Sequence, residues 1–397
     1  MNKVHTSARA AGQSNYYFAD KLREIRQRVA QGRDVINLGV GSPDLAPGDF
    51  VGEAIGQDMP ADGAFSYQPY RGVSGLSAAV VQYLQRHFDV TLTEEGVLPL
   101  MGSKEGCGFL SLAHLDPGDG ALVPDPGYPT YAAATRMAGG VALPYALRPE
   151  TGYHPEVDVL DKQLAQALDT GCEVRILWLN YPHMPTGASP DQSRLKPVLQ
   201  WAQQHGILVV NDNPYSRVLN SAAPFSLLSL KEAEGTAIEL HSLSKSHRLA
   251  GGRVGFALGA PHLLAPLFRV STQFASGSWR PMQSAAIAAM SQGEADIQRV
   301  NGIYGQRKRI VLELLERLGC DVRADQTGLF VWARAPHGTD GDQLSDAVLD
   351  QCDVFVTPGS IFGSEGIDFV RVSLCTPEAR IEEARLRIAS AFAQSHE

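Results

Sequence analysis

The sequence contains few cysteines, no excess of basic residues and no long apolar run. Its five cysteines are odd in number and never spaced as Cys-x-x-Cys, which argues against a disulfide framework or a cysteine-based metal site. The net charge of −9, without a Lys/Arg cluster, argues against nucleic-acid binding. No run approaches the roughly 18 apolar residues of a membrane span, and Met1–Ser7 lacks a signal-peptide core. We therefore expect a cytoplasmic protein with neither a membrane nor a nucleic-acid partner.

Short apolar runs recur along the chain from about residue 96 to 260 and alternate with amphipathic segments such as Ser103–Leu115 and Pro190–His205. Each run is apolar on both faces, as in the strands of a sheet covered on both sides. This alternation predicts an α/β fold with a mostly parallel, doubly wound, seven-stranded sheet. The seven runs are Val97–Met101, Ala121–Val123, Val141–Tyr145, Val174–Leu179, Ile207–Val210, Ala237–Leu240 and Val254–Leu258.

The pattern changes after about residue 285. Two long helical patterns, Gly293–Leu318 and Pro377–Gln394, bracket three strand-like pieces, Gly328–Ala333, Val354–Thr357 and Phe369–Val372. This is typical of a smaller α+β domain, and 397 residues are enough for two domains. We expect residues 1–45 to pack with the small domain, residues 46–284 to form a large cofactor-binding domain, and residues 285–397 to form the small domain.

One segment carries the strongest chemical signal. Ser242-Leu-Ser-Lys245 is followed, across a glycine-rich turn, by Arg253. A phosphorylated aldehyde cofactor needs an amine that condenses with the aldehyde, together with a hydroxyl and a guanidinium that hold the phosphate. The alternative interpretation is a solvated basic turn between two strands, but the apolar runs on both sides favour the cofactor site.

Other suggestive residues also follow predicted strands, where doubly wound sheets bind ligands. Gly102-Ser103-Lys104 opens a helix whose amides can take a phosphate, although Ser103 could be a simple helix cap. Tyr128 could stack on a flat heterocycle or be an ordinary buried tyrosine. Asp212 could keep a pyridine nitrogen protonated, or it could cap a helix.

Taken together, these motifs resemble the class I/II aminotransferases, fold type I enzymes that use pyridoxal 5′-phosphate. The resemblance rests on Ser-x-Ser-Lys-x5-Gly-x-Arg-x-Gly, Asp-x-x-Tyr and the Gly-Ser-Lys turn. It extends to Leu38–Asp44, Tyr67–Leu76 and Thr357–Gly363 with the arginine after it, so it covers essentially the whole chain. Asn37–Asp44 and Asp125–Pro129 are most similar to the diaminopimelate aminotransferase-like branch.

The resemblance implies three catalytic residues, Lys245, Asp212 and Tyr215, and a cofactor-binding residue, Tyr128. Lys245 would form the Schiff base with the cofactor and then move the proton between substrate Cα and cofactor C4′. Asp212 would pair with the pyridine nitrogen, Tyr215 would hydrogen-bond the ring hydroxyl, and Tyr128 would stack on the ring.

The resemblance also implies how phosphate and substrate are held. The phosphate would be bound by the Ser103 and Lys104 amides, by Ser242 and Arg253, and by Tyr67 of the other subunit. Because Tyr67 would reach across an interface, a homodimer with shared active sites is expected.

The substrate α-carboxylate would be gripped by Arg371, helped by the Gly41 amide. The substrates would be an L-amino acid and a 2-oxo acid. Their side-chain specificity is not readable from the sequence, although Arg280 could meet a second carboxylate or be a surface residue.

One position departs from the family pattern. The family has Asn-Pro-Thr-Gly where this chain has Met184-Pro-Thr-Gly187. The asparagine donates to the ring hydroxyl oxygen, and a thioether has no N–H to give. Tyr215 alone, a water molecule or His183 could supply the missing hydrogen bond.

Alternative functions share the fold or the cofactor. A lyase, decarboxylase or cyclase would begin with the same Schiff base, whereas the presence of both Lys245 and Arg371 favours transamination. A regulatory module that binds the cofactor without turnover usually carries a DNA-binding extension, and none precedes residue 30. A nicotinamide dehydrogenase is disfavoured because no Gly-x-Gly-x-x-Gly follows a strand.

Overall fold

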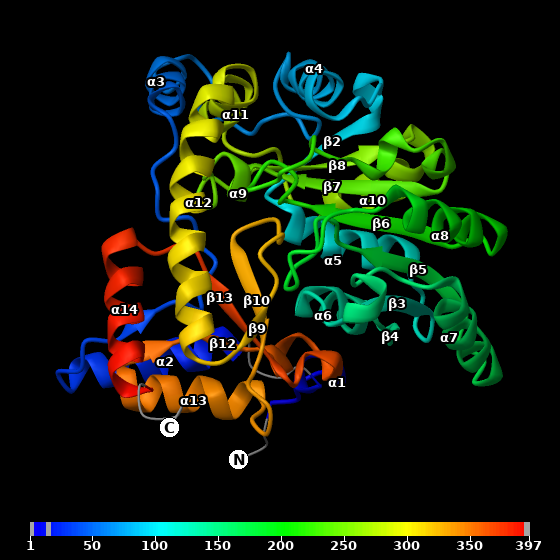
Figure 1. The fold of residues 1–397 in the computed structure, drawn as a ribbon. Helices are drawn as coiled ribbons and strands as arrows, with labels where there is room; N and C mark the ends of the chain where they lie inside the picture. The colour runs from blue at the N-terminus through cyan, green and yellow to red at the C-terminus, as the bar shows by residue number, and fades with distance from the viewer. Residues whose placement is uncertain (1–3, 13–16, 393–397) are drawn as a thin grey trace.

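A seven-stranded sheet forms the centre of the larger part of the protein. The computed structural model describes residues 4–12 and 17–392. Each of the seven runs predicted between about residues 96 and 260 forms a strand of this sheet (Figure 1). The order is β2-β8-β7-β6-β5-β3-β4, and only β8 runs antiparallel to its neighbours. The prediction of a mostly parallel sheet is confirmed. The strands are β2 (Val97–Leu100), β3 (Gly120–Asp125), β4 (Val141–Ala146), β5 (Val174–Leu179), β6 (Leu208–Asn213), β7 (Ala237–Ser242) and β8 (Gly255–Gly259).

Helices cover both faces of this sheet because its strands are apolar on both sides. Along β3, Ala121 and Val123 join one hydrophobic cluster, and Leu122 joins another on the opposite face. The first face carries α5 (Ser103–His114), α6 (Pro129–Met137) and α10 (Pro261–Phe274). The other carries α7 (Val157–Asp169) and α8 (Gln192–Gln204), while α3 (Asp49–Asp58), α4 (Leu76–Phe88) and α11 (Arg280–Gln292) pack together beside β2 and β8.

A second, antiparallel sheet has the order β12-β13-β10-β9. The predicted strand Val354–Thr357 divides between two sheets, because Val354 and Phe355 pair with β1 whereas Thr357 pairs with β13. The elements of this part are β1 (Ile36–Asn37), β9 (Asp321–Val322), β10 (Phe330–Arg334), β11 (Val354–Phe355), β12 (Thr357–Pro358), β13 (Phe369–Ser373), α12 (Glu294–Arg317), α13 (Gly341–Cys352) and α14 (Glu378–Ala391).

The N-terminal segment packs with this second part. Its β1 pairs with β11, and α2 (Tyr17–Ala30) places Ile25 against Leu349 and Phe355. In Figure 1 the long helix α12 runs from beside α11 down to the second sheet. The predicted helix Pro377–Gln394 begins at Glu378, and its Gln394 end lies outside the described residues.

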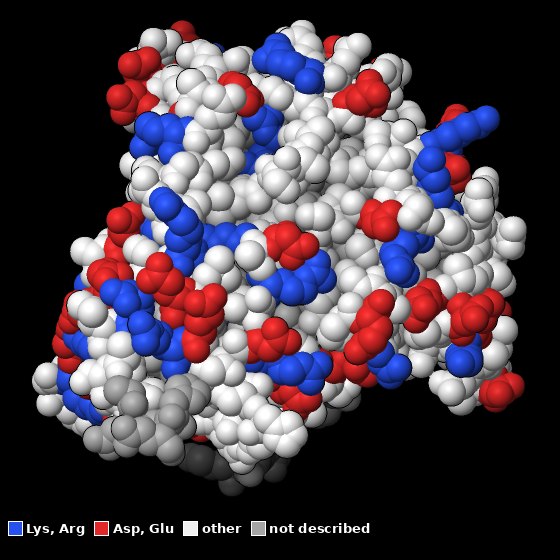
Figure 2. Space-filling model, viewed as in Figure 1, with Lys and Arg blue, Asp and Glu red and all other residues white. Residues whose placement is uncertain are grey.

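The remaining helices are short. They are α1 (Ala8–Ala11), α9 (Leu243–Ser246) and the 3-10 turns η1 (Glu94–Gly96), η2 (Pro149–Thr151), η3 (Leu227–Ser229), η4 (Lys231–Ala233), η5 (Gly359–Phe362) and η6 (Ser364–Gly366). Within the described ranges, no helix combines the length and apolarity needed to cross a bilayer. Acidic and basic side chains are interspersed over the face that Figure 2 shows.

Candidate active site

A cavity of about 380 Å³ lies where the carboxyl ends of β5, β6 and β7 face the second sheet. It brings together residues far apart in the sequence, from the glycine segment near residue 40 to strand β13. Ten of the eleven predicted site residues line it: Gly41, Ser103, Lys104, Tyr128, Asp212, Tyr215, Ser242, Lys245, Arg253 and Arg371. Only Tyr67 does not.

Lys245 is presented by the single turn α9, which begins directly after β7. Its Nζ donates to the carbonyl oxygen of Gly41 at 2.6 Å. Burial lowers the pKa of Lys245, because removal from water disfavours the ammonium form, and the nearby Arg371 and Arg253 charges lower it further. A lysine with a lowered pKa is suited to act as a base or as a nucleophile.

Asp212 offers one carboxylate oxygen to the cavity. Its Oδ2 accepts a hydrogen bond from the Tyr131 hydroxyl at 3.0 Å, whereas its Oδ1 is buried and has no partner among the described residues. Burial raises the pKa of Asp212 to about 6, against the effect of the Tyr131 bond. Since Asp212 lies inside β6, the helix-cap interpretation is wrong. The unpartnered oxygen fits the protonated nitrogen of a pyridine ring.

A fully buried carboxylate on the neighbouring strand holds the end of β6. Glu239 of β7 accepts from Asn211 Nδ2 at 2.8 Å and from Asn213 Nδ2 at 3.3 Å, the residues on either side of Asp212. It also accepts from Ser226 Oγ at 2.6 Å. Alternate residues of a strand point to opposite faces, so Glu239 fixes β6 from the face opposite Asp212.

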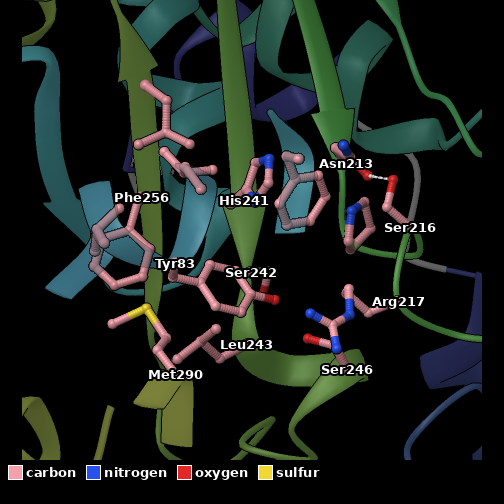
Figure 3. Close-up of a pocket in the computed structure, with 15 residues that line it drawn as sticks. Tyr83, Asn213, Ser216, Arg217, His241, Ser242, Leu243, Ser246, Phe256 and Met290 are labelled. Atoms are coloured by element: carbon pink, nitrogen blue, oxygen red, sulfur yellow. Dashed lines mark hydrogen bonds between the residues drawn. The ribbon is translucent and has the colours of Figure 1, made fainter. Parts of the chain in front are cut away.

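Further contacts spread from these asparagines to the neighbouring loops. Figure 3 shows Asn213 Oδ1 bonded to the Ser216 hydroxyl, at 2.6 Å, beside His241. His241 Nε2 lies 2.6 Å from a Glu239 oxygen. Hydrogen bonds to Glu239 from His241, Ser226 and Asn211 lower the pKa of its carboxyl group, although burial acts in the opposite direction. Glu239 is therefore held as an anion with its oxygens satisfied.

A second group of residues that line the cavity suits an anion. Ser103 is the first residue of α5 and does not cap it, because the N-cap is Gly102, which makes no side-chain cap hydrogen bond. Gly102 has φ +87°, and a Cβ there would lie 2.5 Å from an Arg253 nitrogen, so only glycine allows this approach. Ser242 accepts from the Ser244 amide at 3.2 Å, which leaves its own O–H to donate. The amides at the start of α5 and the Arg253 guanidinium suit a phosphate.

Arg371 also lines the cavity, where it lies between aromatic rings. Its Cζ is 3.8 Å from the Phe330 ring centroid and 4.6 Å from that of Phe362. Its Nη2 donates to the Gly39 carbonyl oxygen at 2.9 Å, and its Nη1 contacts the Met184 sulfur at 3.2 Å. A guanidinium fixed in this way is suited to grip a carboxylate.

Met184 lines the cavity, but its thioether side chain has no hydrogen-bond donor. Its backbone N–H donates to Asn180 Oδ1 at 2.9 Å, and Asn180 Nδ2 donates to the Asp212 carbonyl oxygen at 2.6 Å. His183, considered from the sequence as a substitute donor, does not line the cavity. Its Nδ1 lies 2.8 Å from Thr186 Oγ1, and burial lowers its pKa to about 3. The structure therefore leaves Tyr215, or a water molecule, for this role.

Two sequence candidates lie outside the cavity. Tyr67 is 93% exposed, in the loop before α4. Arg280 pairs with Asp58 Oδ1 at 2.9 Å and donates to the Asp62 carbonyl oxygen at 3.1 Å. The charge of Arg280 is thus already compensated within its own chain.

Three functional residues were missed from the sequence. Tyr131 and Asn180 both belong to segments that follow predicted strands, but their contacts with Asp212 join residues 81 and 32 positions apart. Glu239 lies inside the apolar run Ala237–Leu240. A charged residue at that position could have indicated a buried, paired carboxylate. A charged residue in a strand covered on both faces must be paired.

Comparisons with known proteins agree with this geometry. The family model of the class I and II aminotransferases matches residues 33–388. An LL-diaminopimelate aminotransferase of Aquifex aeolicus is 34% identical over 375 residues, 94% of this chain and 95% of that protein. One from Trichormus variabilis is 34% identical over 379 residues, 95% of this chain and 96% of that protein.

Solved structures are similar over nearly the full length. Substrate-bound BacF of Bacillus subtilis superposes with a TM-score of 0.92 at 29% identity, covering 98% of each chain. The Thermus thermophilus aspartate aminotransferase with maleate has a TM-score of 0.88 at 25% identity, covering 98% of this chain and all of that one. The relatives confirm the resemblance to the diaminopimelate aminotransferase branch. The chain belongs to the class I and II aminotransferases. It is therefore a pyridoxal 5′-phosphate-dependent enzyme that transfers an amino group between an amino acid and a 2-oxo acid.

Proposed function

We propose that this aminotransferase carries out its reaction with Lys245 as the proton-transferring base, Asp212 and Tyr215 at the cofactor ring, and Arg371 at the substrate carboxylate. The observation that carries the proposal is that the Lys245 amine, the unpartnered Asp212 oxygen and the Arg371 guanidinium line one cavity. Bound pyridoxal phosphate supplies an aldehyde that takes up the amino group and a ring that withdraws electrons.

Lys245 has the properties that proton transfer requires. Its lowered pKa favours the neutral amine, and only a neutral amine can attack an aldehyde or accept a proton. Its hydrogen bond to Gly41 orients the side chain towards the cavity. Lys245 is therefore the group that would move the proton between substrate Cα and cofactor C4′.

The other residues bind and orient. With the cofactor bound, Asp212 would pair with the ring nitrogen and keep it protonated, Tyr215 would donate to the ring hydroxyl oxygen, and Tyr128 would cover one face of the ring. Arg371 binds the α-carboxylate through two parallel hydrogen bonds, with the Gly41 amide as a further donor.

A second group of cavity residues would hold the cofactor phosphate. Ser103, Lys104, Ser242 and Arg253 all line the cavity, and the amides of Ser103 and Lys104, the Ser242 hydroxyl and the Arg253 guanidinium would bind the phosphate there. The helix α5 also directs the positive end of its dipole there. Tyr67 of a second copy of the chain completes the phosphate site.

The surface around Tyr67 supports a homodimer. Phe65, Tyr67 and Phe274 are 77%, 93% and 71% exposed. The Phe65 ring lies 6.0 Å from that of Trp279, and Gln68 pairs with Gly277 in a β-bridge. Exposed aromatic side chains gathered in this way are typical of a subunit interface. Two copies would bury this aromatic surface, formed by residues 65–70 and 274–279, and share their active sites.

We also propose the domain division and the location of the enzyme. The large domain extends to Gly293 rather than to residue 284, because α11 continues to Gln292 and packs on α3. We assign residues 1–45 to the small domain because β1 pairs with β11 and α2 packs against Leu349 and Phe355, whereas α1 also contacts α6 of the large domain.

The five cysteines are all buried free thiols, which supports a cytoplasmic location.

Replacement of Lys245 tests the function directly. Borohydride should fix the cofactor onto Lys245 of the holoenzyme, and peptide mapping would identify the modified residue. We expect Lys245→Ala to bind the cofactor weakly and to lose turnover by several orders of magnitude. Near-normal transamination by that variant would overturn the assignment.

A further inference from the structure

A single carboxylate joins the end of strand β3 to the segment between β12 and β13. Asp125, the last residue of β3, accepts from the Ser364 amide at 3.1 Å, from the Ser364 hydroxyl at 2.6 Å and from the Glu365 amide at 3.0 Å. Both donor residues belong to η6. These three hydrogen bonds, which we call the Asp125 contact, connect the seven-stranded sheet to the second part of the molecule.

The Asp125 carboxylate is a fixed anchor. It is buried, and both of its oxygens accept hydrogen bonds, as a carboxylate removed from water requires. Hydrogen bonds to an ionised acceptor are stronger than those between neutral groups. The backbone of Asp125 is held as well, because its carbonyl oxygen accepts from the Leu147 amide at 2.7 Å.

Gly363, the residue before the donors, is fitted to this contact. Its φ of +136° is a conformation that residues with a side chain rarely adopt. A Cβ at this position would also collide with the Asp125 carboxylate. Both the backbone angle and the close approach therefore require glycine here.

The segments on both sides of the contact lead into the active-site cavity. Tyr128, three residues after Asp125, lines the cavity, and so does Phe362 of η5. The Gly127 amide donates to the Phe362 carbonyl oxygen at 2.8 Å, which ties the two segments together a second time. The Phe362 ring in turn lies 4.6 Å from the Arg371 guanidinium.

Of the two rings that flank Arg371, Phe362 is the one that depends on this contact. Phe330 lies in β10, which pairs with β13, the strand of Arg371, so its place is set within one sheet. Phe362 lies in η5, directly before the residues that Asp125 holds. Trp332 supports the Phe362 ring by an edge contact at 5.9 Å, so loss of the Asp125 contact should loosen the ring without releasing it.

We propose that Asp125 is a positioning residue for substrate binding, because its hydrogen bonds to η6 hold Phe362 against Arg371 and so orient the guanidinium. This inference rests on the proposed role of Arg371 in binding the substrate α-carboxylate. Asp125 is not among the described residues that line the cavity. It therefore acts through residues 359–366 and not by touching the substrate.

Hydrogen exchange of the holoenzyme tests the contact itself. Asp125→Asn replaces one accepting oxygen by an NH2 group, so part of the contact is lost. We expect the amides of residues 359–366 to exchange about tenfold faster in this variant, while those of β5, β6 and β7 stay unchanged.

Asp191→Asn is the matched control. Asp191 also accepts from an amide and a hydroxyl, those of Ser193 at 2.8 and 2.6 Å, but this contact lies within one segment at the start of α8. It joins no distant parts of the chain. Exchange at residues 359–366 should therefore stay at the wild-type rate in this variant.

The half-reaction with an amino donor tests the consequence for binding. Glutamate, alanine, phenylalanine and LL-diaminopimelate are offered singly to the wild-type holoenzyme, and those that change the cofactor absorbance are then used with the variants. We expect Asp125→Asn to raise the half-saturating concentration of each such donor about tenfold and by a similar factor, because all share the α-carboxylate. The limiting rate should stay within about threefold.

Ser364→Ala carries the same test in a milder form. It keeps both amide donors to Asp125, so the fold is retained, and the half-saturating concentration should rise about threefold. A merely structural role of Asp125 would reduce the amount of folded enzyme, and with it the amplitude of the absorbance change. It would not move the half-saturating concentration.

The outcomes separate the inference from the proposed function. Unchanged exchange at residues 359–366 in Asp125→Asn, or a smaller amplitude at an unchanged half-saturating concentration, would overturn the inference while the aminotransferase assignment stands. An equal rise in Asp191→Asn would overturn it as well. If no donor changed the wild-type absorbance, the role of Arg371 would fail first, and the inference with it.

Discussion

At the scale of single residues, Met184 distinguishes this site from the family pattern. We expect Met184→Asn to lower the pH midpoint of the bound cofactor's absorbance change by roughly one unit, because an amide N–H would stabilise the deprotonated ring oxygen. A spectrophotometric pH titration of both holoenzymes measures this. Met184→Leu, which adds no donor, is the control and should titrate like the wild type. An unmoved midpoint in Met184→Asn would mean that another donor already serves the ring oxygen.

Asp212 illustrates how a functional charge costs stability. Its folded pKa of about 6 lies above the ordinary aspartate value, so the folded apoenzyme holds the proton more tightly than the unfolded chain does. Stability must then fall as the pH rises from about 4 to 6. We expect Asp212→Asn to stabilise the apoenzyme by about 1–3 kcal/mol at pH 7.5, although the variant should lose activity.

Denaturant unfolding of the two apoproteins at pH 4 and pH 7.5 provides the measurement. At pH 4 the wild-type carboxyl is largely protonated, so the two unfolding free energies should converge. A variant that is less stable than the wild type at both pH values would show that the ionised Asp212 is fully compensated by its surroundings.

At the scale of secondary-structure elements, strand β6 is positioned from behind by Glu239. We expect Glu239→Gln to lower kcat about tenfold while KM for the amino donor stays within about threefold. The amide replaces one of the two accepting oxygens by an NH2 group, so either Asn211 or Asn213 then faces a donor and the strand end loosens. The unfolding free energy should fall by about 2–4 kcal/mol.

The control for this prediction is Ser226→Ala. It removes a donor to Glu239 that does not come from β6, so stability should fall by about 1–2 kcal/mol with kcat nearly unchanged. Equal kcat values in the wild type and both variants would reduce Glu239 to a role in folding alone. A pH titration of the cofactor absorbance gives a second readout of how Asp212 is placed.

The elements themselves were largely predictable, whereas their directions and distant contacts were not. The seven strands could be predicted because each is a short apolar run. Strands β3, β6, β7 and β8 are buried along their whole length, whereas the edge strand β4 is partly exposed. The antiparallel direction of β8 depends on its neighbours and not on its own apolar pattern. Motifs identified Lys245, Asp212 and Arg371, but nothing local revealed that Tyr131 bonds Asp212.

At the scale of the whole molecule, the shared active site can be tested by mixing inactive chains. Co-expression of Lys245→Ala with Tyr67→Ala should restore about a quarter of wild-type activity, because half of randomly assorted dimers are mixed and one of their two sites is native. Each variant expressed alone is the control. If Tyr67 served the site of its own chain, every site in the mixture would carry a defect and no activity would return.

The close packing around the glycine segment also constrains how this sequence can drift during evolution. A Cβ at Gly39 would lie 2.2 Å from a Phe355 ring carbon, and one at Gly41 would lie 2.1 Å from the ring of Phe330. Neither glycine can change unless the ring opposite it shrinks first. Homologues with alanine at position 41 should therefore carry a smaller residue at position 330, so the two positions would be inherited as a pair.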